Sequence, residues 1–188
     1  MKNLSPKIRE NYTLYKKLID KEKTINQNII VLQQASNNKW RDKTEIINHD
    51  SEEEMLFEAA KQKVELKYGL KIFIKQLHPE PVFYFDSDGP SHDNRDANTK
   101  LIDTKIKTPH INYFDDKGEK KARRTQYIED NEEALQNDID LGMLFFCKEA
   151  NINQFGVVPT ILYSSGILPL QQKTEFDVHK GVDFFNGN

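Results

Sequence analysis

Residues 70–85 read LKIFIKQLHPEPVFYF, and this stretch decides the fold class. The period over Leu70–Gln76 is alternating or continuous apolar, which predicts a strand, and the run VFYF at 82–85 predicts a second, buried strand. Prolines separate the two runs, because proline cannot donate to the hydrogen-bond ladder of a sheet. The centre of the chain is therefore predicted to form a sheet.

Before this stretch, apolar residues recur at helical spacing. Ser5 and Pro6 suit the N-cap and the first turn of a helix, and residues 1–38 are predicted to form an N-terminal helical element. Ser51 and Glu54 have the spacing of a capping box, in which each side chain bonds the backbone N–H of the other residue. This pair predicts another helix that runs up to the first strand.

After this stretch, further strands and a helix are predicted. Strands are expected at 101–106, 111–114 and 122–128, and Asp116-Lys117-Gly118 has the composition of a hairpin turn. A final helix is predicted from an apolar face at helical spacing. This face consists of Leu135, Ile139, Met143, Phe146 and Ala150.

The order of these elements predicts an α+β fold. We expect a mainly antiparallel sheet of about four to five strands, covered by helices, with a helical N-terminus. Residues 39–163 are predicted to form this core domain. Residues 164–188 contain several aromatic residues, and we expect this tail to dock on the core or on a partner.

The composition predicts a soluble protein of the cytoplasm. The formal net charge of −3 gives no overall attraction to nucleic acid or to an anionic membrane, so any such contact needs a local patch. The single cysteine, Cys147, excludes an intramolecular disulfide and suits a reducing compartment. No run approaches the roughly 18 apolar residues that span a bilayer, and we expect no membrane partner.

One hypothesis for the function is a metal-dependent nuclease or phosphodiesterase. Asp86 or Asp88 closes a predicted strand, and Asp103 and Lys105 form Asp-x-Lys in the next one. Carboxylates bind Mg²⁺ or Mn²⁺, which activates water, and a lysine stabilises charge that develops on phosphate. The order resembles the D…(D/E)-x-K pattern of the restriction-endonuclease-like superfamily, which implies catalytic roles for Asp88, Asp103 and Lys105. Alternation along a solvent-exposed edge strand explains the same spacing.

A second hypothesis is a transition-metal site. His92 and His110 would bind Zn²⁺ or a related ion together with Asp86 or Asp88. The spacing of the two histidines is not that of a known metal motif, and single histidines are more often hydrogen-bonded in loops or in cores. The sequence leaves both interpretations open.

A third hypothesis places partner binding on the predicted hairpin. Its cations suit phosphate groups or an acidic protein surface, and two flanking tyrosines suit stacking on a base or ring. The cations are Lys117, Lys120, Lys121, Arg123 and Arg124, and the tyrosines are Tyr113 and Tyr127. The same charges also suit a solvated hairpin tip that keeps an edge strand from aggregating.

Three runs of the chain resemble one family: DSDGPSHDN at 86–94, TPHINYFDDKG at 108–118 and MLFFCKEANI at 143–152. This is an uncharacterised family of small proteins from phages, mobile elements and Gram-positive bacteria. Its pattern is Gly-Pro-x-His in a loop and Pro-His-x-His-x-Tyr on a strand. The chain departs from the pattern at Asn112, which stands in place of the second histidine. The resemblance implies a setting of phage–host conflict.

Two expectations follow for the function. The first is a small phage-type protein that acts by binding a protein or nucleoprotein partner, for example as an inhibitor of a host defence nuclease such as a CRISPR effector. Nucleic acid would be contacted through the basic hairpin. The second is the metal-dependent nuclease, with Mg²⁺, Mn²⁺ or Zn²⁺ as cofactor. A concavity that gathers the polar residues of 86–115 would favour the second. The sequence leaves the oligomeric state open.

Overall fold

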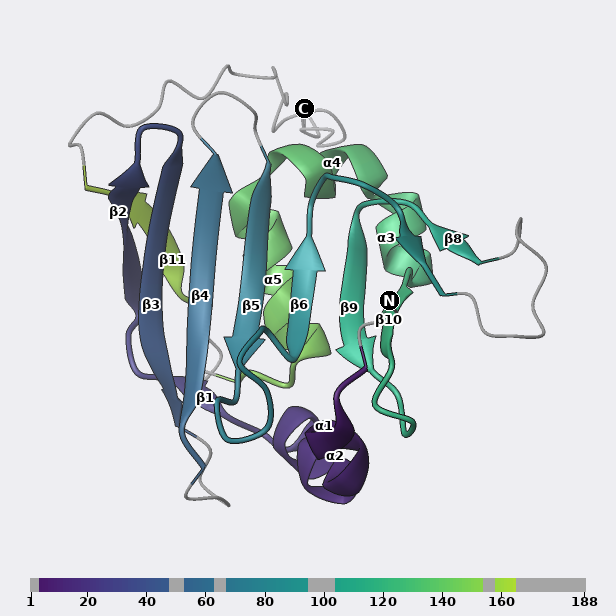
Figure 1. Ribbon diagram of the computed structural model, residues 1–188. Helices are drawn as coiled ribbons and strands as arrows, with labels where there is room; N and C mark the ends of the chain where they lie inside the picture. Colours follow the sequence, from purple (N-terminus) through teal and green to yellow (C-terminus); the bar gives the residue numbers. More distant parts are fainter. Residues whose placement is uncertain (1–3, 48–52, 63–66, 95–103, 154–157, 165–188) are drawn as a thin grey trace, which may run out of the picture.

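The computed structural model describes residues 4–47, 53–62, 67–94, 104–153 and 158–164. Within these ranges the helices are α1 (Pro6–Glu10), α2 (Tyr12–Asp20), α3 (Gln126–Asp130), α4 (Glu132–Asn137) and α5 (Ile139–Glu149). The strands are β1 (Thr24–Ile25), β2 (Ile29–Ser36), β3 (Lys39–Ile47), β4 (Met55–Gln62), β5 (Tyr68–Phe73), β6 (Phe83–Asp86), β7 (His92–Asp93), β8 (Lys105–Ile106), β9 (His110–Phe114), β10 (Lys120–Arg123) and β11 (Thr160–Tyr163). One large sheet dominates the described chain (Figure 1).

The large sheet has nine strands. Its order is β10-β9-β6-β5-β4-β3-β2-β11, and β1 pairs with β3. The pairs along this order are antiparallel, except that β11 runs parallel to β2. β7 and β8 form a separate antiparallel ribbon, which we term the arm. The sheet is therefore mixed.

The prediction of about four to five strands covered by helices is wrong, because the observed sheet has nine strands. Two segments that were predicted to be helical are strands. Residues 24–36 of the predicted N-terminal helical element contain β1 and β2, and β4 replaces the helix predicted after Ser51. The N-terminal region is helical up to Asp20.

Burial explains why β4 resembles a helix in sequence. Phe57, Glu58, Ala59 and Ala60 are all buried, so this strand lacks the alternation that marks a half-exposed strand. Its residues pair with β3 on one side and with β5 on the other. These long-range hydrogen bonds outweigh the helix propensity of glutamate, leucine and alanine in the segment.

Other predicted elements are confirmed. Ser5 caps α1 by accepting a hydrogen bond from the N–H of Ile8, and Pro6 stands in the first turn. The strands predicted at 70–76 and 82–85 correspond to β5 and β6, and the predicted hairpin turn joins β9 to β10. The prediction of one final helix is confirmed only in part, because α4 ends and α5 begins at Asp138. The residues of its predicted apolar face are all buried: Leu135, Ile139, Met143, Phe146 and Ala150.

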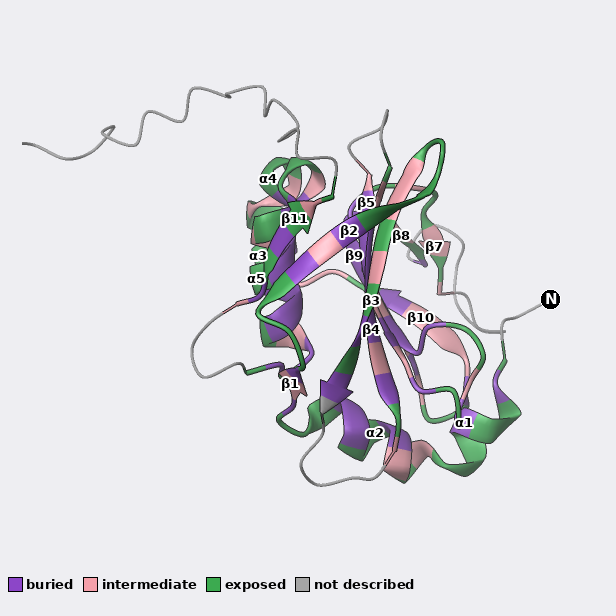
Figure 2. Ribbon diagram, turned by 90° about the vertical axis from the view of Figure 1, so that its left-hand side faces the viewer, coloured by how far each residue is buried: buried purple, intermediate pink, exposed green. Residues whose placement is uncertain are grey.

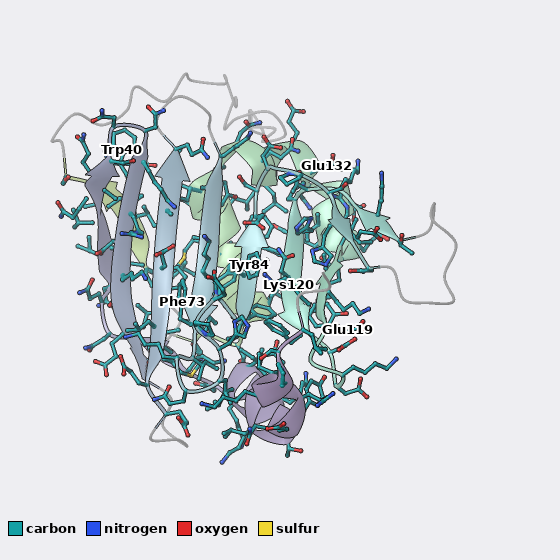
Figure 3. The ribbon with its side chains drawn as sticks, in the orientation of Figure 1. Trp40, Phe73, Tyr84, Glu119, Lys120 and Glu132 are labelled. Carbon is teal, nitrogen blue, oxygen red and sulfur yellow. The ribbon has the colours of Figure 1, made fainter. Side chains whose placement is uncertain are left out.

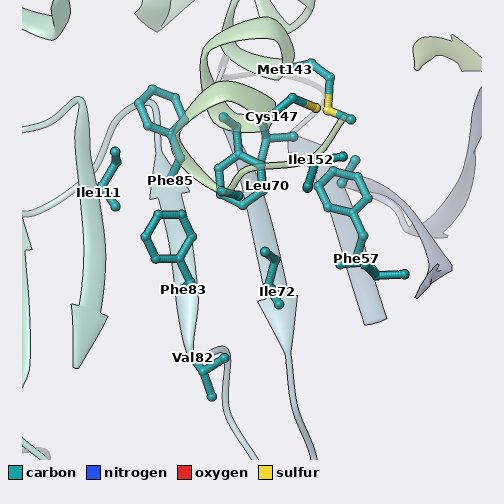
Figure 4. Packing of buried hydrophobic residues seen from close by; sticks show 14 of the residues in the cluster. Phe57, Leu70, Ile72, Val82, Phe83, Phe85, Ile111, Met143, Cys147 and Ile152 are labelled. Atoms are coloured by element: carbon teal, nitrogen blue, oxygen red, sulfur yellow. The ribbon is translucent and has the colours of Figure 1, made fainter. Parts of the chain in front are cut away.

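One face of the sheet packs against α5 and forms the core. The ring of Phe146 in α5 lies 5.9 Å from Phe57 of β4 and 5.7 Å from Phe83 of β6, measured between ring centres. Figure 4 shows further buried side chains of the strands, such as Leu70, in the same layer. Burial of each large apolar side chain contributes roughly 2–3 kcal/mol, so this layer fixes the position of the strands.

The opposite face of the sheet is not covered by α3–α5, which lie behind the strands in Figure 1 and on one side of them in Figure 2. α1 and α2 close one end of the sheet, where the hydroxyl of Tyr15 donates to the carbonyl of Val82 and accepts from the N–H of Phe114. We term the surface formed by the outward side chains of β3–β6 the open face.

Candidate functional site

Four cations gather on the open face. Lys39, Arg41 and Lys43 occupy alternate positions of β3, so their side chains leave the same side of the strand. Lys71 lies two strands away on β5. The register of the sheet pairs Lys43 with Glu58 of β4, and Glu58 with Lys71. We term these four cations the basic patch.

Glu58 lies at the centre of the basic patch. Its side chain is only 4% exposed, and its carboxylate oxygens lie 3.3 Å from Lys43, 3.7 Å from Lys71 and 3.7 Å from Arg41. A carboxylate that is buried to this extent requires compensating charge. The four cations supply more positive charge than the carboxylate of Glu58 needs. Glu58 sets one negative charge against these four positive charges, and Asp86, which interacts with Lys71, lies beside them, so the patch keeps an excess of positive charge.

Lys39 is the member of the basic patch that forms no ion pair with a described carboxylate. Burial lowers the pKa of Lys39, and the nearby ammonium of Lys71 lowers it further, whereas Glu58 opposes both effects. The charged form of Lys39 is therefore under-compensated. An added anion beside it would stabilise this charge.

Two aromatic rings of the open face are covered by ammonium groups. The Nζ of Lys43 lies 4.5 Å from the ring centre of Phe73, and the Nζ of Lys120 lies 5.2 Å from that of Tyr84 (Figure 3). Such contacts are favourable because the ring face carries negative charge density. Each ring thus has a lysine in a position where a nucleic-acid base would otherwise stack.

Asp86 ends β6 beside the basic patch, where β9 presents two polar side chains to it. The Nε2 of His110 lies 3.8 Å from the Oδ2 of Asp86, and the Nδ2 of Asn112 donates to the same oxygen at 3.1 Å. Burial raises the pKa of Asp86, and His110 opposes this rise. Burial also lowers the pKa of His110, against the effect of Asp86. Both groups are thereby shifted toward their neutral forms.

The arm brings His92 next to His110, with ring centres 6.3 Å apart. The Nε2 of His92 lies 3.2 Å from the carbonyl oxygen of Lys120, which holds the arm against β10. Burial lowers the pKa of His92. The structure therefore brings together His92, His110 and Asp86 from three different strands.

Asp88 turns away from this histidine group. Its carboxylate accepts from the N–H of Gly89 at 2.7 Å and lies 3.6 Å from the Nζ of Lys67. In the described part of the chain, no three side chains of histidine, cysteine, aspartate or glutamate are grouped as metal ligands. The geometry thus gives no support to a Zn²⁺ site made of Asp86, Asp88, His92 and His110, and that site stays a prediction.

The nuclease hypothesis also stays a prediction. Asp103 lies outside the described residues, so its distance from Asp88 is not defined. Lys105 is exposed on β8 of the arm, where it pairs with Asp93. The segment of the helix predicted after Ser51 is β4, and its Glu58 is surrounded by cations. The geometry of the described residues thus favours no nuclease centre.

The structure does not bring the cations of the predicted hairpin onto one face. Lys121, Arg123 and Arg124 lie 2.9, 2.9 and 2.6 Å from the carboxylates of Glu119, Glu149 and Glu132, respectively. Lys120 turns to the open face above Tyr84, and Lys117 is exposed in the turn. Most of these charges thus hold β10 to its neighbours in the fold.

The two flanking tyrosines also have contacts within the protein. The guanidinium of Arg123 lies 5.6 Å from the ring centre of Tyr113. The ring of Tyr127 stacks on Phe145 of α5, with centres 5.4 Å apart. Neither ring shares a surface with the basic patch, since both contacts are made on the side of the sheet that α5 covers.

The hypotheses drawn from the sequence missed the basic patch, although part of it has a sequence signal. Residues 39–47 read KWRDKTEII, in which Lys39, Arg41 and Lys43 recur with the two-residue period of a strand. This pattern predicts a strand with one basic face. Glu58 and Lys71 have no comparable signal, because the sheet register alone brings them beside β3.

Comparison of the chain with protein-family models, with curated proteins and with solved structures found no match. Within the described residues, no helix is both long enough and apolar enough to cross a lipid bilayer. The chemistry of the open face is therefore the main structural guide to the function.

Proposed function

We propose that the protein acts as a binding protein whose basic patch docks on an acidic surface of a partner protein. The observation that carries this proposal is the arrangement of Lys39, Arg41, Lys43 and Lys71 around the nearly buried carboxylate of Glu58. Such an excess of positive charge on one rigid surface is complementary to a cluster of carboxylates.

The geometry of the patch suits docking. The side chains of Arg41 and Lys43 remain 46% and 43% exposed while they contact Glu58, so each is held in place and still faces outward. Adjacent strands fix the positions of their backbones, which lowers the entropy lost when a partner binds. Because the whole chain has a formal net charge of −3, a local positive patch also orients the approach of an acidic partner.

The same surface suits a nucleic acid less well. Nucleic-acid binding needs a groove of cations that follows the phosphate backbone, whereas these cations surround one carboxylate, that of Glu58. Single-stranded nucleic acids also gain much of their affinity from stacking on open aromatic rings. On the open face, Phe73 and Tyr84 are covered by lysines. These features favour carboxylates on a protein.

The proposed partner class is a host defence nuclease, such as a CRISPR effector, which the protein would inhibit. The resemblance to small phage proteins supports this class. The chemistry of the patch agrees with it, since metal-dependent nucleases gather carboxylates to hold their ions. A basic surface placed over such carboxylates would block them.

The proposal is tested with a fluorescein-labelled octaglutamate peptide, followed by fluorescence anisotropy at low ionic strength. The variant Arg41→Gln/Lys43→Gln removes two charges of the patch. The control Lys7→Gln/Lys148→Gln removes two charges from exposed sites in α1 and α5. We expect the patch variant to bind about tenfold more weakly than wild type, a loss of about 1.4 kcal/mol. The control should bind like wild type.

Two outcomes contradict the proposal. Equal weakening in the patch variant and in the control would show that only net charge matters. Tighter binding of single-stranded or duplex DNA of matched charge, lost in the same patch variant, would make nucleic acid the partner. An octaglutamine peptide serves as the uncharged probe, and thermal melting of each variant confirms that it is folded.

A further inference from the structure

A small pocket opens in the open face above Gly69 of β5. It has a volume of about 130 Å³ and is lined by residues of β3, β4, β5 and β6 and of the adjoining loops. Its lining includes Lys39, Lys67, Gly69, Lys71, Asp86 and Asp88. Two of them, Lys39 and Lys71, belong to the basic patch, so the pocket and the patch form one surface.

Gly69 creates this pocket by having no side chain. A Cβ at this position would stand 3.4 Å from the Cε of Lys71, 3.5 Å from the carbonyl oxygen of Phe85 and 3.6 Å from the Oδ1 of Asp86. These are ordinary contact distances, and Gly69 is not among the residues with a positive φ. The fold therefore does not require glycine at this position, whereas the pocket does.

The volume of the pocket limits what it holds. Sites for whole cofactors or drug-sized ligands enclose roughly 300–1,000 Å³. A pocket of about 130 Å³ is well below that range. It suits a single side chain that reaches in from a docked surface.

The charges around the pocket favour an acidic side chain. Four lysines line the pocket, and the Nζ of Lys61 lies over the ring of Tyr163, so Lys39, Lys67 and Lys71 remain beside the carboxylates of Asp86 and Asp88. Asp88 lies 3.6 Å from the Nζ of Lys67. Asp86 accepts from the amide of Asn112 at 3.1 Å, and Lys71 lowers its pKa. This leaves Lys39, which has no ion pair with a described carboxylate.

We propose that the pocket above Gly69 receives one glutamate or aspartate side chain of the partner protein, whose carboxylate pairs with Lys39 and Lys71. This inference rests on the proposed function and names its central contact. The strength of a buried charge pair depends strongly on its geometry. This contact would therefore fix how the partner protein is aligned on the open face.

The test fills the pocket without changing any charge. Gly69→Ala and Gly69→Val add one and three carbon atoms to its floor, and valine also suits a strand. Gln33→Val adds the same valine to the same side of the sheet on β2, away from the pocket, and serves as the control. We expect the affinity for octaglutamate to fall severalfold in Gly69→Ala and at least tenfold in Gly69→Val. Gln33→Val should bind like wild type.

A second pair of variants tests the pocket if Gly69→Val is not folded at the temperature of the binding assay. Lys39→Met and Lys43→Met each remove one patch cation and keep an unbranched side chain. Only Lys39 of the two lines the pocket. We therefore expect Lys39→Met to weaken binding more than Lys43→Met.

The possible failures are distinguishable. If Gly69→Ala and folded Gly69→Val bind like wild type while Arg41→Gln/Lys43→Gln loses affinity, the pocket inference is overturned and the proposed function stands. Equal losses in Lys39→Met and Lys43→Met would also overturn the pocket inference. If the patch variant itself binds normally, both proposals fall.

Discussion

The imidazole of His110 faces the carboxylate of Asp86 across β9 and β6, with Nε2 and Oδ2 3.8 Å apart. The other ring nitrogen, Nδ1, lies 3.3 Å from the carbonyl oxygen of Lys107, so it carries a proton. Nε2 therefore faces Asp86 as the ring nitrogen that gains a proton when His110 becomes charged. This relationship connects two parts of the open face, because Asp86 lines the pocket and His110 contacts the arm through His92.

The stability of the protein should decrease as the pH falls below about 6.5. Burial lowers the pKa of both His92 and His110 from 6.5. Just below pH 6.5 the unfolded chain therefore binds protons that the folded chain does not bind. As a result, the free energy of unfolding decreases as the pH decreases. The raised pKa of Asp86 acts in the opposite sense, with a stabilising effect that grows as the pH falls toward 3.8.

Chemical denaturation at several pH values checks this prediction. The fall near pH 6 should be smaller in His110→Gln, which has no titrating ring. In Asp86→Asn it should extend to lower pH, because the carboxylate that raises the pKa of His110 is gone. An unchanged pH dependence in His110→Gln would contradict the assignment.

Lys23 should be essential for stability although it lies far from the open face. Its fully buried ammonium donates to the carbonyl oxygens of Ile19 and Lys21 at 2.7 Å each, and to that of Ala150 at the end of α5. Lys23→Met leaves these carbonyls without a donor, and we expect a loss of about 3 kcal/mol in the free energy of unfolding. Urea denaturation measures it. Lys16→Met, at an exposed site of α2, should change the value by less than about 0.5 kcal/mol.

Tyr68 should stabilise the contact between β5 and the corner of α4 and α5. Its buried hydroxyl donates to the carbonyl oxygens of Leu135 and Asp138, the latter at 2.9 Å. Tyr68→Phe removes the donor and should lower the free energy of unfolding by about 1–2 kcal/mol. Tyr127→Phe alters an exposed residue and should be neutral within about 0.5 kcal/mol in the same assay. Equal effects of the two substitutions would argue against the role of Tyr68.

Asn94 should protect the free edge of β10. Its side chain donates to the carbonyl of Ala122 at 2.7 Å and accepts from the N–H of the same residue at 2.8 Å, so it replaces a neighbouring strand. In Asn94→Ala the amide of Ala122 should exchange with solvent about tenfold faster or more. Hydrogen exchange followed by NMR detects this change. Asn137→Ala on α4 is the control, and unaltered exchange at Ala122 in both variants would remove Asn94 from this role.

The sequence predicts an element where its apolar residues show a clear strand or helix pattern. The apolar pattern of Leu70–Gln76 predicts β5, and the helical spacing of apolar residues from Leu135 to Ala150 predicts the buried face of α4 and α5. β4 escaped prediction because it is buried on both faces and has helix-forming residues. Because segments that form strands were predicted to be helical, the predicted sheet had too few strands.

The candidate site depends on contacts that no local pattern contains. Glu58 and Lys71 meet Lys43 because β3, β4 and β5 pair in one particular register, and a shift by one residue would send these side chains to the opposite face. The pocket depends on the absence of a side chain at Gly69. Of the residues suggested by the sequence, Asp86 and Asp88 line this pocket. His110 lies beside Asp86, and His92 lies next to His110.

The central claim is that an acidic partner docks on the basic patch. Its most direct test is an NMR titration of the labelled protein with octaglutamate, in which amide shifts are mapped onto the chain. We predict that the largest shifts cluster at residues 39–43 and 69–71. Shifts confined to the hairpin at 117–124, or the absence of any saturable shift, would contradict the account.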